Sequence, residues 1–148
     1  MPTGAIQLQR VLRAPPERIY HAFLDADAMA KWLPPHGFTC KVGHMDARVG
    51  GGYKMLFTNF ATGRSQSFGG NYQQLQPGQL IRYTDSFDDP NLPGEMHTTV
   101  RLRQVSCGTE LTIEQEGLPA AIPLELCHLG WQQSLEQLAN LVEADVAD

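Results

Sequence analysis

Polar and apolar residues alternate through most of the middle of this chain, a pattern typical of a β-sheet with one buried face. The clearest run is 95–105, in which Met96, Val100 and Leu102 occupy one side and polar or charged residues the other. Gly78 and Gly108 supply turns before and after this region. Seven strands are predicted, one near the N-terminus and six in succession: 5–13, 38–46, 52–60, 66–76, 79–88, 95–105 and 109–116.

Three other segments are expected to be helical. Pro15-Pro16-Glu17 suits a first helical turn, because proline lacks the amide hydrogen that would be unpaired there and glutamate favours the positive end of the helix dipole. A second short helix is expected to have Asp27 as its N-cap and to stop before Pro34-Pro35. Apolar residues recur every three or four positions over 124–142, which predicts one long C-terminal helix.

Composition places this pattern in one soluble domain spanning 1–148. The apolar share is 42% and the charged share 18%, both ordinary for a globular protein, and no apolar run is long enough to span a bilayer. The N-terminus lacks a basic segment followed by an apolar core, so no secretory signal is expected and the cytoplasm is the predicted location. The net charge is −5 and basic residues are scattered, which argues against a nucleic-acid partner.

Sequence motifs for catalysis or metal binding are missing. The five histidines have no metal-ligand spacing, no serine lies in a G-x-S-x-G elbow, and the triple glycine at 50–52 precedes a strand rather than a helix. No catalytic residue, metal or cofactor is therefore assigned. Cys40, Cys107 and Cys127 are far apart and odd in number, so we expect reduced thiols in the core.

Short motifs along nearly the whole chain resemble one protein family. They are Ala14-Pro15-Pro16-Glu17-Arg18-Ile19-Tyr20, Lys31-Trp32-Leu33-Pro34-Pro35-His36-Gly37-Phe38, Arg48-Val49-Gly50-Gly51-Gly52-Tyr53, Gly70-Asn71-Tyr72, Tyr83-Thr84, Gly108-Thr109-Glu110-Leu111 and Gly130-Trp131-Gln132-Gln133-Ser134-Leu135. Their order resembles the heat-shock-protein-90 ATPase activator homologue family, within the START-like (SRPBCC) helix-grip superfamily. The resemblance implies an α+β fold in which a curved antiparallel sheet of about seven strands wraps a long C-terminal helix, with two short helices after the first strand.

That fold implies a cavity between the concave sheet face and the C-terminal helix. Strand parity selects side chains that would line it, and two tryptophans and a leucine would close it from the helices. Aromatic rings offer broad contact area, and tyrosine and tryptophan add a polar group that orients a ligand. The expected ligand-binding residues are Trp32, Phe38, Tyr53, Met55, Phe57, Phe68, Tyr72, Tyr83, Asp85, Phe87, Trp131 and Leu135. The alternative is that these side chains only fill the core.

Asp85 stands out among them, because Tyr83 and Phe87 on the same strand place it on the inward face. Burial there would raise its pKa and suit it to general acid or base chemistry. The alternative is structural, since the strand ends at Asp88 and water or a turn amide would then satisfy the carboxylate.

Three functions follow from this interpretation. The first is a binding protein for a small hydrophobic or amphipathic molecule. The second is a cyclase- or dehydratase-like enzyme that moves a proton with Asp85 or Tyr83 in the same cavity. The third is a co-chaperone-type interaction module that uses the loop 88–95, although no additional N-terminal domain of the kind found in the co-chaperone is visible. The sequence assigns no oligomeric state.

Overall fold

The computed structural model describes residues 4–147, so residues 1–3 and 148 of the predicted domain lie outside it. Its elements in chain order are β1 (Gly4–Leu12), α1 (Pro16–Leu24), α2 (Ala26–Trp32), β2 (Phe38–Met45), β3 (Gly52–Asn59), β4 (Ser65–Gln76), β5 (Leu80–Phe87), β6 (Met96–Val105), β7 (Gly108–Leu118) and α3 (Leu124–Val142). The predicted order is confirmed, and each strand bound lies within two residues of its prediction.

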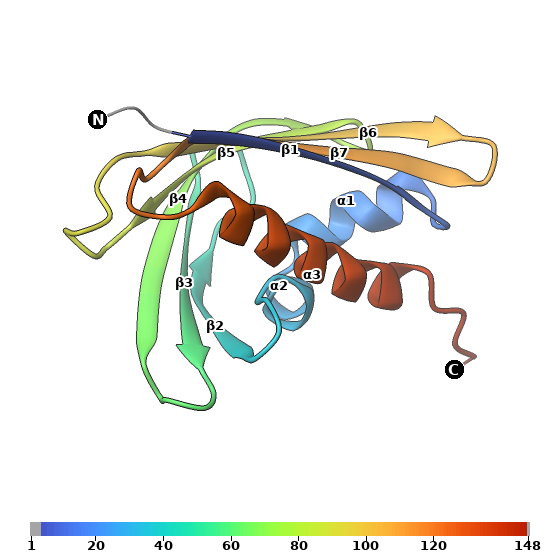
Figure 1. Cartoon of the computed structure of the whole chain (residues 1–148). Helices are drawn as coiled ribbons and strands as arrows, with labels where there is room; N and C mark the ends of the chain where they lie inside the picture. Colours follow the sequence, from blue (N-terminus) through green and yellow to red (C-terminus); the bar gives the residue numbers. More distant parts are fainter. Residues whose placement is uncertain (1–3, 148) are drawn as a thin grey trace.

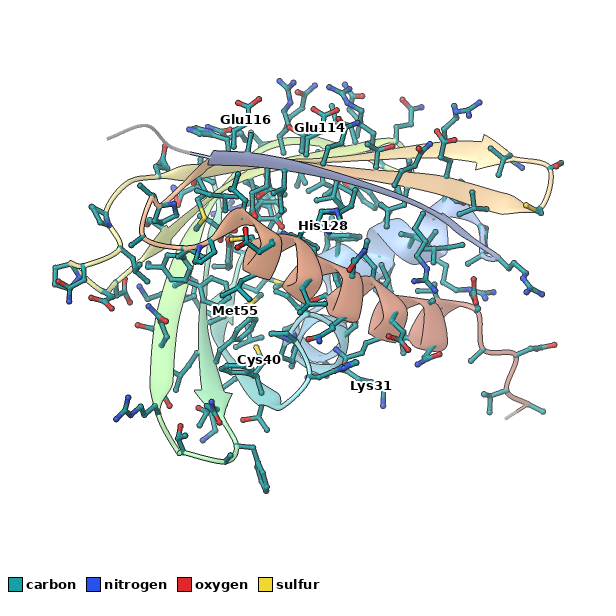
Figure 2. All side chains as sticks on the ribbon, in the orientation of Figure 1. Lys31, Cys40, Met55, Glu114, Glu116 and His128 are labelled. Atoms are coloured by element: carbon teal, nitrogen blue, oxygen red, sulfur yellow. The ribbon has the colours of Figure 1, made fainter. Side chains whose placement is uncertain are left out.

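The seven strands form one antiparallel sheet in the order β1-β7-β6-β5-β4-β3-β2. The sheet curves around α3, which crosses its concave side, and α1 and α2 carry the chain from the β1 edge to the β2 edge (Figure 1). Polar strand positions face outward. Figure 2 shows Glu114 and Glu116 on the convex side and Met55 between the sheet and α3. The α+β helix-grip fold is therefore confirmed.

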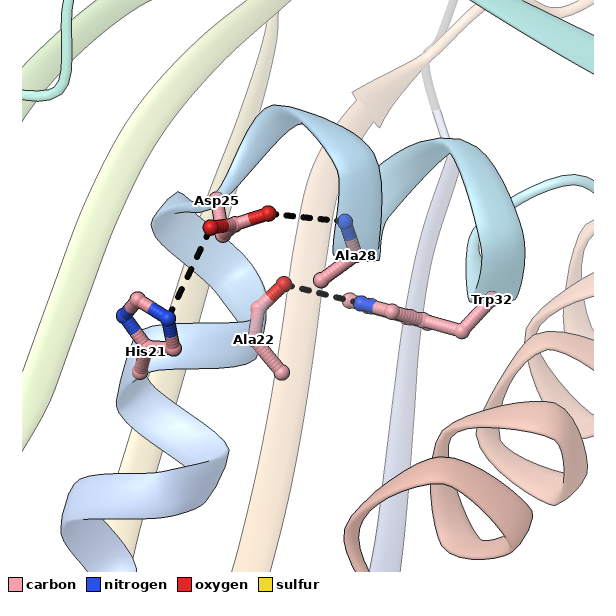
Figure 3. A network of polar contacts seen from close by, with 5 residues as sticks. All are labelled: His21, Ala22, Asp25, Ala28 and Trp32. Carbon is pink, nitrogen blue, oxygen red and sulfur yellow. Dashed lines mark hydrogen bonds and ion pairs between the residues drawn. The ribbon is translucent and has the colours of Figure 1, made fainter. Parts of the chain in front are cut away.

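The N-cap of α2, at the corner between α1 and α2, differs from the predicted one. Asp25, not Asp27, is the N-cap of α2, because its Oδ1 accepts a hydrogen bond of 2.9 Å from the Ala28 amide (Figure 3). The helix begins at Ala26, two residues earlier than a cap at Asp27 would require, so Asp27 lies in the first turn. An acidic residue there still interacts favourably with the helix dipole.

Trp32 fixes the angle of this corner. Its side chain is fully buried, and its Nε1 donates a hydrogen bond of 2.9 Å to the Ala22 carbonyl of α1 (Figure 3). The ring also packs edge-on against Phe23, with ring centroids 4.7 Å apart. One side chain thus joins both short helices to the core.

Replacing Trp32 with phenylalanine is expected to lower the free energy of unfolding by about 2 kcal/mol. The change leaves the Ala22 carbonyl without its donor and opens a small void beside Phe23. Urea denaturation followed by circular dichroism measures the loss. Trp131→Phe is the matched control, because Trp131 is only partly buried, and a cost for Trp32→Phe no larger than the control would contradict this account.

The interior between sheet and helix divides into two halves. The C-terminal half of α3 contributes five buried residues, whereas its first two turns contribute none. Opposite the buried half, apolar side chains of β1, β6 and β7 and of α1 fill the space completely. This filled half contains Leu12, Ile19, Val100, Leu102, Leu111, Ile113, Leu135, Leu138, Ala139 and Val142. Under the first turns of α3, the interior is hollow.

Candidate functional site

A cavity of about 400 Å³ lies between the N-terminal half of α3 and the concave face of the sheet. Strands β2 to β5 supply most of its wall, and α3 closes it from above with Cys127, Gly130, Trp131 and Ser134. These four positions recur at intervals of three and four, so they form one face of the helix. The hollow half of the interior is therefore enclosed by the strands and the helix together.

The wall is built mainly from aromatic rings that contact one another. Tyr53 lies near Tyr72 and Tyr83, with ring centroids 5.7 and 5.9 Å away, and Phe57 packs edge-on against Phe68 at 4.8 Å. Such tilted and edge-on contacts hold rings in defined positions. The aromatic part of the wall consequently offers a large contact area whose rings are held in place by one another.

The structure brings ten of the twelve predicted ligand-binding residues to this cavity. They are Phe38, Tyr53, Met55, Phe57, Phe68, Tyr72, Tyr83, Asp85, Phe87 and Trp131. The other two, Trp32 and Leu135, do not line it. Trp32 turns toward the Ala22 carbonyl, and Leu135 lies in the filled half of the interior.

Sequence reasoning missed part of the lining. The missed side chains come from the two short helices, the inner strands, the loop before α3 and α3 itself: Phe23, Met29, Leu33, Pro35, Gln66, Met96, Gln115, Leu118, Ile122, Leu126, Cys127, Gly130 and Ser134. Two signals were available for some of them. Met96 and Gln115 share the inward parity of their strands, and Gly130 lies on the same helical face as Trp131.

Most polar groups around the cavity hydrogen-bond within the protein. Trp131 Nε1 donates to Gln115 Oε1 at 3.0 Å, and Gln115 Nε2 donates to the Thr98 hydroxyl at 3.0 Å. Tyr53 donates its hydroxyl to the Thr84 carbonyl at 3.1 Å. These bonds hold the wall together and occupy the Tyr53 hydroxyl, the Trp131 indole N–H and one amide N–H of Gln115.

Asp85 is the exception. Its side chain is 7% exposed, and its Oδ1 is fully buried with no hydrogen-bond partner among residues 4–147. Burial raises its pKa well above the ordinary carboxyl value. No turn amide among residues 4–147 donates to Asp85 Oδ1; at the strand end it is Asp88, three residues on, that pairs with Lys54 and Ser67.

The cavity opens to solvent near the start of α3. Leu126 and Phe38 line it and are also 58% and 38% exposed, so they mark its mouth. Gly130 lies inside this mouth, and a Cβ at that position would meet no heavy atom within 4 Å. The helix therefore leaves free space at Gly130 on the face that looks into the cavity.

The three cysteines differ in burial, which corrects one prediction. Cys107 is exposed in the β6–β7 turn, whereas Cys40 and Cys127 are half-buried. Burial raises the pKa of the Cys40 thiol to about 11 and also raises that of Cys127, so both stay protonated at neutral pH.

Among residues 4–147, no cluster of His, Cys, Asp or Glu is arranged to hold a metal, and no helix is long and apolar enough to cross a membrane.

Solved structures of similar proteins share this architecture. A protein from Chromobacterium violaceum is 64% identical with a TM-score of 0.94, covering 95% of this chain and 98% of its own. A protein from Rhodobacter sphaeroides (19% identity, TM-score 0.83, 95% and 96% coverage) and an AHSA1-like protein from Aeromonas hydrophila (17%, 0.77, 95% and 92%) share the fold. No curated protein matches the sequence significantly.

A family-level match agrees with the motifs and the fold. The profile of the family described as "Activator of Hsp90 ATPase homolog 1-like protein" matches residues 13–143, which include every element from α1 to α3. The expected resemblance is thereby confirmed. This chain belongs to the family of activator of Hsp90 ATPase homolog 1-like proteins.

Proposed function

We propose that this protein binds a small hydrophobic or amphipathic molecule in the cavity beneath α3. The observation that carries the proposal is the cavity itself, whose volume of about 400 Å³ lies within the roughly 300–1,000 Å³ of small-molecule sites. A lining made only to fill the core would pack closely, because empty space beside buried rings lowers stability. Here the rings pack against one another and still leave the cavity between them and α3.

The neutral fluorescent probe N-phenyl-1-naphthylamine tests the proposal. Its emission is expected to rise and shift to the blue on saturable binding of one probe per chain. Gly130→Leu is expected to weaken binding about tenfold or more, because the new side chain extends into the free space at Gly130. This helix position tolerates leucine well, since glycine is the poorer helix former.

Gln132→Leu is the matched control for that variant. It adds the same side chain to an exposed position of α3 that does not line the cavity. Its affinity for the probe is expected to stay within about twofold of the parent protein, a difference below 0.5 kcal/mol. Equal probe affinity in the parent and in Gly130→Leu, or no saturable binding at all, would refute a ligand site at this cavity.

A proton-transfer enzyme of the cyclase or dehydratase kind is the second candidate. One observation favours it: Asp85 and Tyr83 are both buried, both line the cavity, and burial raises the pKa of both groups. A carboxyl group whose pKa is raised by burial holds its proton more tightly than an exposed one and is suited to act as a general acid. Mass spectrometry of a bound ligand before and after incubation separates the two functions, since a binding protein returns it unchanged.

A further inference from the structure

The ligand, we infer, is a small cationic amine with an apolar or aromatic body, and Asp85 binds its ammonium group. The inference deepens the proposed function and rests on it. Three properties of the cavity support it: the charge of its lining, the state of its hydrogen-bonding groups, and the rings beside Asp85. Each of them favours a ligand that brings positive charge and N–H donors.

The charge of the lining is the first property. Asp85 is the only acidic side chain among the lining residues that the structure describes, and no lysine, arginine or histidine is among them. A fatty acid or another anion would find no positive partner among these residues, which is unfavourable in a low-dielectric site. An ammonium group would find its counter-ion in Asp85.

The hydrogen-bonding inventory is the second property. The Tyr53 hydroxyl, the Trp131 indole N–H and one amide N–H of Gln115 bond to protein acceptors, whereas Asp85 Oδ1 has no donor from residues 4–147. A buried acceptor without a donor is unfavourable, because it has lost its hydrogen bonds to water without gaining one in the protein. A primary amine carries three N–H donors and no acceptor when protonated, so it fits the unused capacity of this site.

The aromatic rings beside Asp85 are the third property. Tyr83 and Phe87 are two residues away on the same face of β5, and the rings of Tyr53, Tyr72 and Tyr83 lie within 6.3 Å of one another. Ring faces attract cations, and the attraction grows when water is excluded. The group that holds the charge is therefore surrounded by surfaces that stabilise a cation and also suit an apolar body.

Binding of an amine should also move a proton. The titratable groups that share the cavity are Tyr53 on β3, Tyr72 on β4, Tyr83 on β5 and Cys127 on α3; β6 and β7 contribute Met96 and Gln115, which do not titrate. Burial raises the pKa of Tyr72 to about 12 and raises those of Tyr83 and Cys127. Asp85 is therefore the group expected to release a proton when an ammonium ion pairs with it.

Three naphthalenes with one body and different head groups test the assignment by calorimetry: 2-naphthylmethylamine, 2-naphthylmethanol and 2-naphthoate. The amine is expected to bind at least about tenfold more tightly than the alcohol, and the carboxylate most weakly. Asp85→Asn should weaken the amine about tenfold or more while changing the alcohol less than about threefold. Retained alcohol binding shows that the variant is folded and its cavity intact.

The pH dependence provides a second readout that does not need the variant. Between pH 5 and 8 the alkylamine stays protonated, and Asp85 must lose its proton to pair with it. Amine affinity is therefore expected to fall as the pH falls, by up to about tenfold per pH unit, with proton release detected by titrating in two buffers of different ionisation enthalpy. The alcohol should show neither effect.

The possible outcomes separate the two proposals. Equal binding of amine and alcohol, tighter binding of the carboxylate, or an unchanged amine affinity in Asp85→Asn overturns the amine assignment and leaves a ligand site standing. The amine assignment is also overturned, and the ligand site still stands, if the amine does not bind while N-phenyl-1-naphthylamine does. If neither the naphthalenes nor the fluorescent probe binds, both proposals fail.

Discussion

Alanine in place of Gly70 is expected to lower the free energy of unfolding by about 3 kcal/mol or more. Gly70 lies in β4 opposite Tyr53, and a Cβ there would stand only 1.8 Å from the Thr84 carbonyl oxygen of β5. That distance is far inside van der Waals contact, and the obstacle is backbone of a neighbouring strand, so no side-chain rotation relieves it. The two strands would have to separate locally.

The same carbonyl accepts the hydroxyl of Tyr53, so the damage is expected to reach the cavity. A methyl group at Gly70 that displaces the Thr84 carbonyl also disturbs the 3.1 Å bond from Tyr53, whose ring contacts Tyr72 and Tyr83. Gly70→Ala should therefore bind N-phenyl-1-naphthylamine more weakly even under conditions in which it is fully folded.

Gly130→Ala is the control, because it makes the same chemical change where a Cβ meets nothing within 4 Å. In mid-helix it is expected to raise the free energy of unfolding by up to about 1 kcal/mol. Urea denaturation monitored by circular dichroism compares both variants with the parent protein. Similar effects of the two changes would contradict the steric explanation, since backbone entropy alone would shift both in one direction.

The strands and their inward faces were predictable because the side-chain period of a strand is two. Because Tyr83 faces inward, Asp85 and Phe87, which are two and four residues further along the strand, also face inward. All three side chains line the cavity. The order of elements and the C-terminal helix followed from equally local signals. Local periodicity therefore predicted the elements, their order and most of the strand-borne wall, whereas the helix-grip arrangement and its cavity were implied by the family resemblance.

The periodicity of a strand does not reveal at which end of the concave sheet face side chains fill the interior and at which end a cavity remains. That depends on how the short helices lie against α3, which is a tertiary property. Trp32 was expected at the cavity, but it turns toward α1 because the Ala22 carbonyl requires a donor. Leu135 was also expected there, yet it lies one turn past Trp131, where Leu12 and Ile113 belong to the filled half of the interior.

The partner of a polar group is equally hard to predict from neighbours in sequence. Asp85 was given a structural alternative because Asp88 and the loop after it are close by along the chain. In the fold, Asp88 reaches Lys54 on β3, while the alternation of β5 turns Asp85 away from solvent and from any donor. The two acids differ in the face of the sheet to which they point and in how deeply they are buried. Asp88 therefore forms an ion pair at the surface, whereas Asp85 is the acidic group of the cavity.

Asp85 is expected to make stability fall as the pH rises above the ordinary carboxyl range. Its pKa is 3.8 when exposed, as in the unfolded chain, and burial raises it well above that in the folded protein. Between these two values the folded state holds a proton that the unfolded state has lost, so each pH unit of increase lowers the free energy of unfolding by up to about 1.4 kcal/mol. The stability is fully present below pH 3.8 and is lost as the pH rises through the folded pKa.

Urea denaturation at pH 5, 6, 7 and 8 measures this slope, and Asp85→Asn is expected to remove it. Asp88 and Glu110 have pKa values lowered by Lys54 and Arg103, so their opposite effect lies below the ordinary carboxyl range, outside the measured window. Asp85→Leu should be more stable than the parent at pH 7 by about 2 kcal/mol, because it replaces an unpaired buried acid with an apolar group. A parent protein whose stability does not depend on pH in this window, or a less stable leucine variant, would mean that Asp85 is satisfied in solution. A gain in stability accompanied by loss of amine binding would instead identify Asp85 as a residue retained for binding at a cost to the fold.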